Sequence, residues 1–476
     1  MTWLRFQKLT KKYAWDLRTW LALLLIAVGM FHPFPPTIRN AITQGLATGY
    51  KLQISLWRVL FEPLFGPLIF LMRSPEPLKL YLTFFFWALF FLLVRNGWRH
   101  RSISRGLLEW LKAVPLYLIV LIGLLWLVIF APLPGDTVSN RNPDTILVNF
   151  HSHSYFSHDG LISWQGQQAW HAAQGFDAFF LTDHNHHQKT LEAVALQRSG
   201  RLPALPLILA GMEYSGSNHI LLLGLQRSFN PKDYSDQAAI DSAHSQSGIA
   251  LIAHWFVPGR RTRNLTAYID SGADGFEIVN QAQGAFHAGS RAQPIIEACR
   301  SRGLLMVAGC DYHGYSHICQ SWTALQIPGW HAMKVVDKQE SILQLLRKKE
   351  QNKITVLVLQ DRPAQLWPIS VRPWQAAFSY LRTLNFYQIL SWLFWSWLLI
   401  RPSVAKRWRQ LAFPFYLCAV LFLLGVGLYL YGQSLSLKEY NDVLGEYGRT
   451  SIAAGILLLL YTLGYFKEKL KIFFAK

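Results

Sequence analysis

The sequence feature that most constrains the fold is a set of apolar segments, each close to the length needed to cross a lipid bilayer. A helix that spans the hydrocarbon core needs about 20 apolar residues, and somewhat fewer where flanking charged side chains reach the interface. A chain that is 51% hydrophobic and 15% charged is also too apolar for an ordinary soluble protein. We predict six spans, at about residues 19–35, 80–94, 113–133, 384–400, 411–431 and 450–466.

A further apolar stretch, 55–72, is interrupted by charged residues and prolines. Arg58 and Glu62 are costly in hydrocarbon, and Pro63 and Pro67 disturb a continuous helix. We therefore assign this stretch to an interfacial or re-entrant piece.

The formal charge of +19 is concentrated beside the apolar segments. Basic residues in short flanking loops mark the cytoplasmic side of a membrane protein. With six spans the basic stretches all fall on one side, which predicts cytoplasmic termini and a long central region on the periplasmic face of a bacterial inner membrane. Because topology accounts for the charge, no nucleic-acid partner is expected. The basic stretches are 5–18, 95–112, 401–409 and 467–476.

The central region, 140–362, is predicted to be one soluble domain between an N-terminal membrane region, 1–139, and a C-terminal membrane region, 363–476. Short apolar runs alternate here with helix-like stretches, which indicates a mostly parallel α/β sheet, open or closed into a barrel. The absence of a Gly-rich phosphate loop disfavours nucleotide-binding versions of this class. Strands are expected at 145–151, 178–183, 207–213, 219–224, 250–254, 275–280, 304–311 and 354–360, and helices at 187–199, 233–246, 290–302 and 337–350.

Side chains that can bind metal ions stand at the ends of these strands, where parallel sheets place their active sites. His151 and His153 lie two residues apart on one strand, so both can reach one ion. A lone pair of this kind is more often a surface feature, but strand after strand here ends in His, Asp or Glu. The groups are His151 with His153, Asp159, Asp183 with His184, Glu213 with His219, His254, and Asp311 with His313.

This pattern resembles the polymerase and histidinol phosphatase (PHP) superfamily over about residues 145–360. The resemblance implies a distorted (β/α)7 TIM-like barrel, flanked in this chain by helical membrane spans. It also implies two or three divalent ions (Zn, Mn or Fe) and phosphoester hydrolysis. The motifs that carry it are FHSHSYFSHDG, LTDHN, GMEYS, NHILLLG, LIAHW, GFEIVN and GCDYHG.

Carried over by position, the resemblance implies a ligand set in which Glu213 bridges two ions. The chain departs from the family pattern twice. One extra residue precedes the acid of the first motif, so His158 competes with Asp159, which we prefer because Gly160 follows it. Trp255 replaces the usual proline after the fifth motif. The implied ligands are His151, His153, Asp159, His184, Glu213, His254, Asp311 and His313, with His219 as a ninth.

Mixed imidazole and carboxylate ligands suit Zn, Mn and Fe, and ions about 3.5–4 Å apart can share a water molecule and lower its pKa. The attacking group would then be a hydroxide bound to the ions, and Ser157 would only cap the backbone. Asp183 is a candidate outer partner or proton carrier, with a helix cap as the alternative. Arg260 and Arg261, with Arg263, could clamp a phosphate or form an ordinary solvated loop.

The cysteines form no CxxC pair, so a zinc-ribbon site is unsupported. A disulfide between Cys299 and Cys319 stays open at this point. Cys310, next to Asp311, is expected to be a small buried residue and not a nucleophile.

Together these features predict a membrane-anchored metal-dependent phosphoesterase whose partners are the lipid bilayer and a phosphorylated substrate. That substrate is either lipid-linked or a soluble periplasmic phosphate. The alternative is a transporter or sensor whose barrel binds metal or ligand without turnover. The scarcity of charges within the spans argues mildly against transport.

Overall fold

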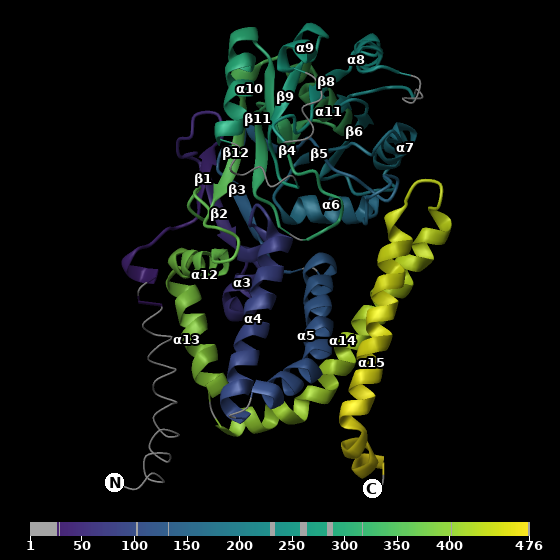
Figure 1. Ribbon diagram of the computed structural model, residues 1–476. Helices are drawn as coiled ribbons and strands as arrows, with labels where there is room; N and C mark the ends of the chain where they lie inside the picture. Colours follow the sequence, from purple (N-terminus) through teal and green to yellow (C-terminus); the bar gives the residue numbers. More distant parts are fainter. Residues whose placement is uncertain are drawn as a thin grey trace.

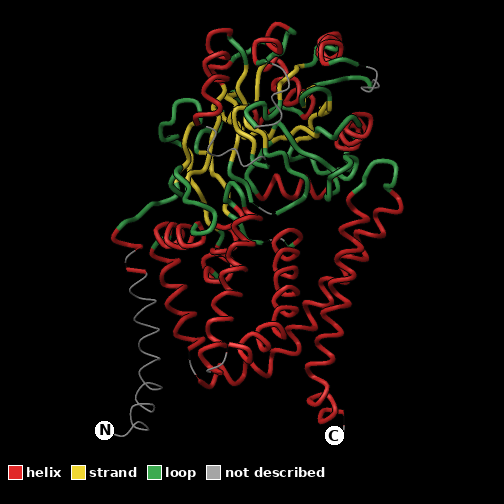
Figure 2. Tube along the Cα trace, viewed as in Figure 1, coloured by secondary structure: helices red, strands yellow, loops and turns green. Residues whose placement is uncertain are grey.

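In the computed structural model, an α/β part stands on a part made only of helices (Figure 1). Figure 2 shows the strands gathered at one end of the molecule and long helices at the other. The described residues are 26–27, 29–100, 103–131, 133–228, 234–257, 264–282, 289–316, 318–400 and 402–474.

Among the described residues, three helices are long and apolar enough to cross a membrane. They are α4 (Pro77–His100), Phe413–Ser436 within α14 (Pro402–Ser436), and Val443–Gly464 within α15 (Val443–Phe474). They contain or overlap the spans predicted at 80–94, 411–431 and 450–466.

The remaining predicted spans correspond to shorter apolar helices or are only partly described. The segment 113–133 falls mostly in α5 (Ile103–Phe130), which holds a shorter apolar helix, Tyr117–Phe130. The segment 384–400 forms α13 (Phe386–Ile400), which has only 15 residues. The described residues include only 26–27 and 29–35 of the predicted span 19–35.

The interrupted stretch 55–72 forms two short helices, α2 (Leu56–Leu60) and α3 (Glu62–Met72). Arg58 is buried, lies 3.4 Å from the Glu62 carboxylate and pairs with Asp136. Glu62 also accepts a hydrogen bond from the Tyr380 hydroxyl at 2.8 Å. The charges that interrupt the apolar stretch are thus neutralised inside the protein, as burial requires.

The α/β part contains one ten-stranded sheet, in the order β1-β12-β11-β4-β5-β6-β7-β8-β9-β10. β4, β5 and β6 are parallel, as are β8, β9 and β10, whereas β7 is antiparallel to both of its neighbours. β4–β10 and β12 are the eight strands expected from the sequence. Their bounds are β4 Thr145–Asn149, β5 Ala178–Leu181, β6 Leu207–Ser215, β7 His219–Leu223, β8 Ile249–Ile252, β9 Gly275–Asn280, β10 Leu305–Gly309 and β12 Ile354–Gln360.

The sheet curls so that the chain after β4 meets the chain after β10. Asp311 N donates to the His151 carbonyl at 2.9 Å, and His153 N donates to the Tyr312 carbonyl at 2.8 Å. The predicted (β/α)7 TIM-like barrel is not confirmed, because a TIM barrel has only parallel strands. Here β7 and β11 (Ser321–Gln326) both run antiparallel to their neighbours, and the result is a curled half-barrel.

Three strands lie wholly or mostly outside the predicted domain 140–362. β1 (Thr37–Asn40) pairs with β12, and β2 (Tyr50–Ile54) pairs with β3 (Asp136–Asn140) in a separate two-stranded sheet. The N-terminal region therefore contributes strands to the α/β part as well as long apolar helices.

The concave side of the curled sheet is filled by apolar side chains such as Ile146, Val148 and Phe180. Leu147, which points the other way from β4, packs in a second cluster. Helices surround the sheet (Figure 1) and include all four that were predicted. They are α6 Trp164–Ala173, α7 His187–Arg198, α8 Asp236–Ser245, α9 Leu265–Asp270, α10 Gly289–Arg302 and α11 Val335–Arg347.

In the helical part, the α4–α5 and α13–α14 junctions and the C-terminal end of α15 lie away from the α/β part (Figure 1). Three of the basic stretches thus share one end of the molecule. The turn between α14 and α15 lies at the opposite end, against the α/β part. α12 (Arg372–Thr383) leads from the sheet back into the helices.

Candidate metal centre

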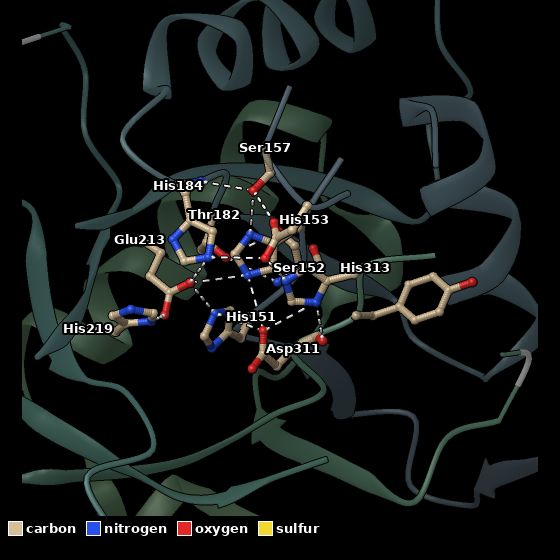
Figure 3. Close-up of polar contacts among 12 residues, drawn as sticks. His151, Ser152, His153, Ser157, Thr182, His184, Glu213, His219, Asp311 and His313 are labelled. Carbon is tan, nitrogen blue, oxygen red and sulfur yellow. Dashed lines mark hydrogen bonds and ion pairs between the residues drawn. The ribbon is translucent and has the colours of Figure 1, made fainter. Parts of the chain in front are cut away.

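The carboxylate of Glu213, near the end of β6, is directed at the histidines of the site (Figure 3). Its Oε2 atom is 3.0 Å from His151 Nε2, 3.2 Å from His153 Nε2 and 3.2 Å from His184 Nε2. Its carboxylate and the His151 and His153 side chains are buried. One carboxylate oxygen therefore faces three imidazole nitrogens that come from two different strand ends.

The second oxygen of Glu213 faces two further predicted ligands. Oε1 lies 2.6 Å from His219 Nδ1 and 3.3 Å from His254 Nε2. Glu213 thus contacts predicted ligands through both oxygens, as the bridging role expected from the sequence would require.

Two aspartates complete the cluster: Asp311, just after β10, and Asp159, in the same β4–α6 loop as His151 and His153. Asp311 Oδ1 lies 3.2 Å from His153 Nε2 and 3.4 Å from His151 Nε2. Asp159 Oδ2 lies 3.0 Å from His313 Nε2 and 3.7 Å from His184 Nε2.

Among the described residues, three groups bring donor atoms close enough to hold an ion. They contain eight of the nine predicted ligands, and His254 lies beside them. His158 belongs to none of the groups, and its side chain is 53% exposed. The groups are His151, His153, Glu213 and Asp311; His153, Asp159, His184 and His313; and His184, Glu213 and His219.

The residues present fit divalent metal ions. The Nε2 atoms of His151 and His153 are buried, and each lies 3.0–3.4 Å from carboxylate oxygens of Glu213 and Asp311. The donor atoms of these four residues therefore surround one position that an ion can occupy. The groups share His153, His184 and Glu213, so ions bound in them would be neighbours.

The carboxylates of the site are in the form that binds metal. Burial raises the pKa of Glu213 and Asp311, but the surrounding histidines outweigh this effect, so both pKa values lie well below the ordinary range. Burial lowers the pKa of His184 to about 3, which keeps this imidazole neutral. Burial also acts to lower the pKa of His151 and His153, but the neighbouring carboxylates outweigh it and raise both, for His153 to about 10. A metal ion would therefore displace a proton from these two rings.

Glu277, at the middle of β9, is a functional residue that the sequence did not identify. Its Oε1 atom lies 2.9 Å from His151 Nδ1, and its Oε2 atom accepts hydrogen bonds from His254 N and from Asn280 Nδ2, each at 3.0 Å. A carboxylate behind a ligand histidine fixes its tautomer and orientation. Glu277 stands inside the GFEIVN motif, and that motif was the only available signal.

Asp183 lies beside the metal groups and belongs to none of them. Its carboxylate accepts hydrogen bonds from Ser154 N at 2.5 Å and Ser154 Oγ at 2.8 Å, so it holds the loop after His153 and does not cap a helix with its side chain. Burial raises the pKa of Asp183 to about 6. Ser157 donates to Asp159 Oδ1 at 2.7 Å and so orients that carboxylate.

The predicted phosphate clamp, Arg260, Arg261 and Arg263, lies outside the described residues. Cys299 and Cys319 do not form a disulfide, because all the cysteines are free. The sulfur near Cys319 Sγ is that of Cys310, at 3.6 Å. Cys310 is buried, and burial raises the pKa of its thiol, which agrees with a structural role.

A cavity of about 410 Å³ opens beside the cluster. Asp159, Asp311 and His313 line one side of it. Residues at and between the end of α3 and the start of α4 also line it, including Met72 and Pro77. We call this space the interfacial cavity, because it joins the metal groups to the start of a candidate membrane helix.

Comparisons with known proteins found structural neighbours only; no protein-family model and no curated protein matches the chain. One neighbour is a two-domain Bacteroides vulgatus protein containing a predicted PHP-like metal-dependent phosphoesterase, with 20% identity and a TM-score of 0.34 over 46% of this chain and 66% of the other. The chain thus spans just under two thirds of that protein.

Two more neighbours have similar scores. A Bifidobacterium adolescentis protein described as a metal-dependent phosphoesterase shares 15% identity, with a TM-score of 0.28 over 35% of this chain and 87% of the other. A Chromobacterium violaceum amidohydrolase with bound sulfate and no metal shares 16% identity, with a TM-score of 0.30 over 40% of this chain and 96% of the other.

Proposed function

We propose that this chain is a membrane-anchored, metal-dependent phosphoesterase. The observation that carries the proposal is the convergence of imidazole nitrogens on both oxygens of Glu213, with the buried Nε2 atoms of His151 and His153 directed also at Asp311. Two or three divalent ions (Zn, Mn or Fe) held by these groups would polarise phosphoryl oxygens and make a bound water more acidic.

The chain's own residues prepare the site for those ions. His151 Nδ1 contacts Glu277, His184 Nδ1 lies 2.9 Å from Ser215 Oγ, and His313 Nδ1 lies 2.8 Å from the Asp311 carbonyl. With Nδ1 engaged in each ring, the Nε2 lone pair is directed into the site. The carboxylates of Glu213 and Asp311 supply the negative charge that binds cations.

We extend the proposal to the shape of the sheet and to the side of the membrane on which the α/β part lies. We take β4–β10 as a distorted seven-stranded barrel, supported by the hydrogen bonds between the chain after β4 and the chain after β10. We place the α/β part on the periplasmic side of a bacterial inner membrane, supported by the common end of the molecule at which three basic stretches lie. The bilayer would then present a phosphorylated substrate, and the proposed substrates include lipid-linked phosphates.

The test is hydrolysis of aryl phosphate monoesters and diesters by the full chain in detergent, with and without a chelator. We expect metal-dependent turnover and more than one metal ion per chain by elemental analysis, since the ligands outnumber the roughly four of one tetrahedral site. Glu213→Gln should lower kcat/KM by more than about a hundredfold, because loss of a ligand exceeds the effect typical of outer partners.

The control is Asp274→Asn, since Asp274 pairs with His244 and Lys349 away from the cluster. This variant should keep both its metal and its activity. Stoichiometric metal binding without turnover of any phosphate ester would reject the enzyme and favour the sensor or transporter alternative.

A further inference from the structure

The interfacial cavity is lined both by candidate metal ligands and by residues at the ends of the apolar helices. The candidate ligands are Asp159, Asp311 and His313. Pro77 is both a lining residue and the first residue of α4, a candidate membrane span. Ser316, another lining residue, donates its backbone N–H to the carbonyl of Ile129, in the last turn of α5, at 3.1 Å. The cavity therefore lies where two apolar helices end.

One hydroxyl group of the lining residues calls for a ligand. Ser316 is 7% exposed, and its hydroxyl has no hydrogen-bond partner among the described residues. Tyr312 also lines the cavity, but its ring stacks on Trp170 in an apolar cluster and is not available to a ligand. A buried hydroxyl without a partner is costly, and a bound molecule with a neutral polar group next to its phosphate would satisfy Ser316.

The charge of the lining limits what that molecule can be. Within the described part of the chain, no Lys or Arg lines the cavity. A second anionic group would therefore lack a cationic partner, so the part of the ligand beyond the phosphate should be neutral. Met72, Pro75 and Ile318 add apolar surface.

From these observations we propose that the interfacial cavity binds a phosphorylated amphiphile. The phosphate lies at the metal groups, a neutral hydroxyl-bearing group faces Ser316, and the apolar chain leaves past Met72 and Pro77 into the bilayer. This inference rests on the proposed phosphoesterase function and names its substrate class. A volume of about 410 Å³ suits a head group, whereas the chain itself would remain with the lipid.

The first experiment detects binding and needs no turnover. The full chain in detergent is exposed to an alkyl phosphonate that carries a hydroxyl group next to phosphorus and a photoreactive diazirine early in its chain. We expect adducts on the peptide that contains Met72 and Pro77, and their loss when unlabelled phosphonate is in excess. Adducts only on exposed helix faces such as Phe86 and Leu428, unaffected by competition, would overturn the proposal.

The second experiment uses a pair of variants at the same turn. Met72→Trp narrows the cavity, whereas Leu78→Trp changes a side chain that is 56% exposed and does not line it. Met72→Trp should raise KM about tenfold for a long-chain phosphate and leave a soluble aryl phosphate unchanged, because only the chain passes this side. Equal effects of the two variants, or equal effects on the two substrates, would contradict the inference.

A third variant tests the polar contact without backbone strain. Ser316 has a φ of +72°, which glycine adopts freely, so Ser316→Gly removes the hydroxyl at no conformational cost. It should weaken the hydroxyl-bearing phosphonate about tenfold relative to its deoxy analogue. An equal loss for both ligands would indicate a purely structural role and count against the proposal.

Failure of the inference and failure of the proposed function give different results. Competition-sensitive adducts in the cavity without hydrolysis of any phosphate ester would reject the enzyme and retain the binding site. Hydrolysis of soluble phosphates without such adducts would retain the enzyme and reject the amphiphile.

Discussion

The side-chain amide of Asn441 donates a hydrogen bond to the carbonyl of Gly160 at 2.7 Å, across 281 positions of sequence. The same amide donates to the Ser157 carbonyl at 2.8 Å, so it holds the loop on both sides of Asp159. Its oxygen accepts from Leu444 N at 2.9 Å, at the start of α15. One residue in the turn between two membrane-type helices therefore connects them to a predicted metal ligand.

Asn441→Asp should separate these two roles, because it keeps the oxygen that caps α15 and loses the N–H donors to the loop. We expect metal affinity to fall about tenfold, as for other outer partners of metal ligands, because the new carboxylate oxygen repels the carbonyls of the loop. Titration of the metal-free protein measures the affinity. The control is Asp442→Ala, because Asp442 reaches the loop through its backbone N–H to His158. Wild-type affinity in Asn441→Asp would remove this positioning role.

Glu277→Gln should weaken metal binding through its effect on His151. The substitution keeps the size of the side chain and removes the charge that faces His151 Nδ1. We expect a loss of metal affinity of about tenfold to hundredfold, measured by the same titration. The affinity of Glu277→Gln should also fall below that of Asp274→Asn, and equality of these two variants would show that the charge of Glu277 does not act on His151.

His171 should make the α/β part sensitive to acid. Burial lowers the pKa of this histidine to about 3, whereas an unfolded histidine has a pKa of about 6.5. The unfolded state therefore takes up a proton first, and stability is lost as the pH falls below about 6.5 towards the folded-state value. Between pH 7 and pH 5 this one group should remove about 2 kcal/mol.

Thermal unfolding of metal-free protein at the two pH values provides the measurement. Other groups titrate in both proteins, so the comparison is the difference in pH dependence between the wild type and His171→Gln. A smaller loss on acidification is expected for the variant, whatever its absolute stability. An identical loss would mean that His171 becomes charged in the folded state.

Reporter fusions should place the α/β part outside the cytoplasm. Fusions after Gly135 and Ser434 are expected to give periplasmic signals, and a fusion after Ser403 a cytoplasmic one, because basic residues flank only that last position closely. A cytoplasmic signal at Gly135 would contradict the topology and direct the search towards soluble cytoplasmic phosphates.

The strands and the clustered candidate ligands could be predicted because their signals are local. Apolar runs such as 145–149 are long enough for one buried strand, and His151, Glu213 and Asp311 follow such runs directly. β11 was missed because SWTALQ mixes polar and apolar residues although nearly all of it is buried. There the polar side chain of Thr323 is satisfied by the Ala308 backbone, which no local pattern reveals.

The sequence by itself therefore determined the order of apolar and polar segments, most strand positions and the residue types that can bind metal. Only the tertiary structure decided that Glu277 supports His151, that Asn441 holds the Asp159 loop and that the α3–α4 turn faces the metal groups. The physical reason is that these contacts join distant segments, and whether a side chain reaches a partner depends on how the sheet curls and where the membrane helices end.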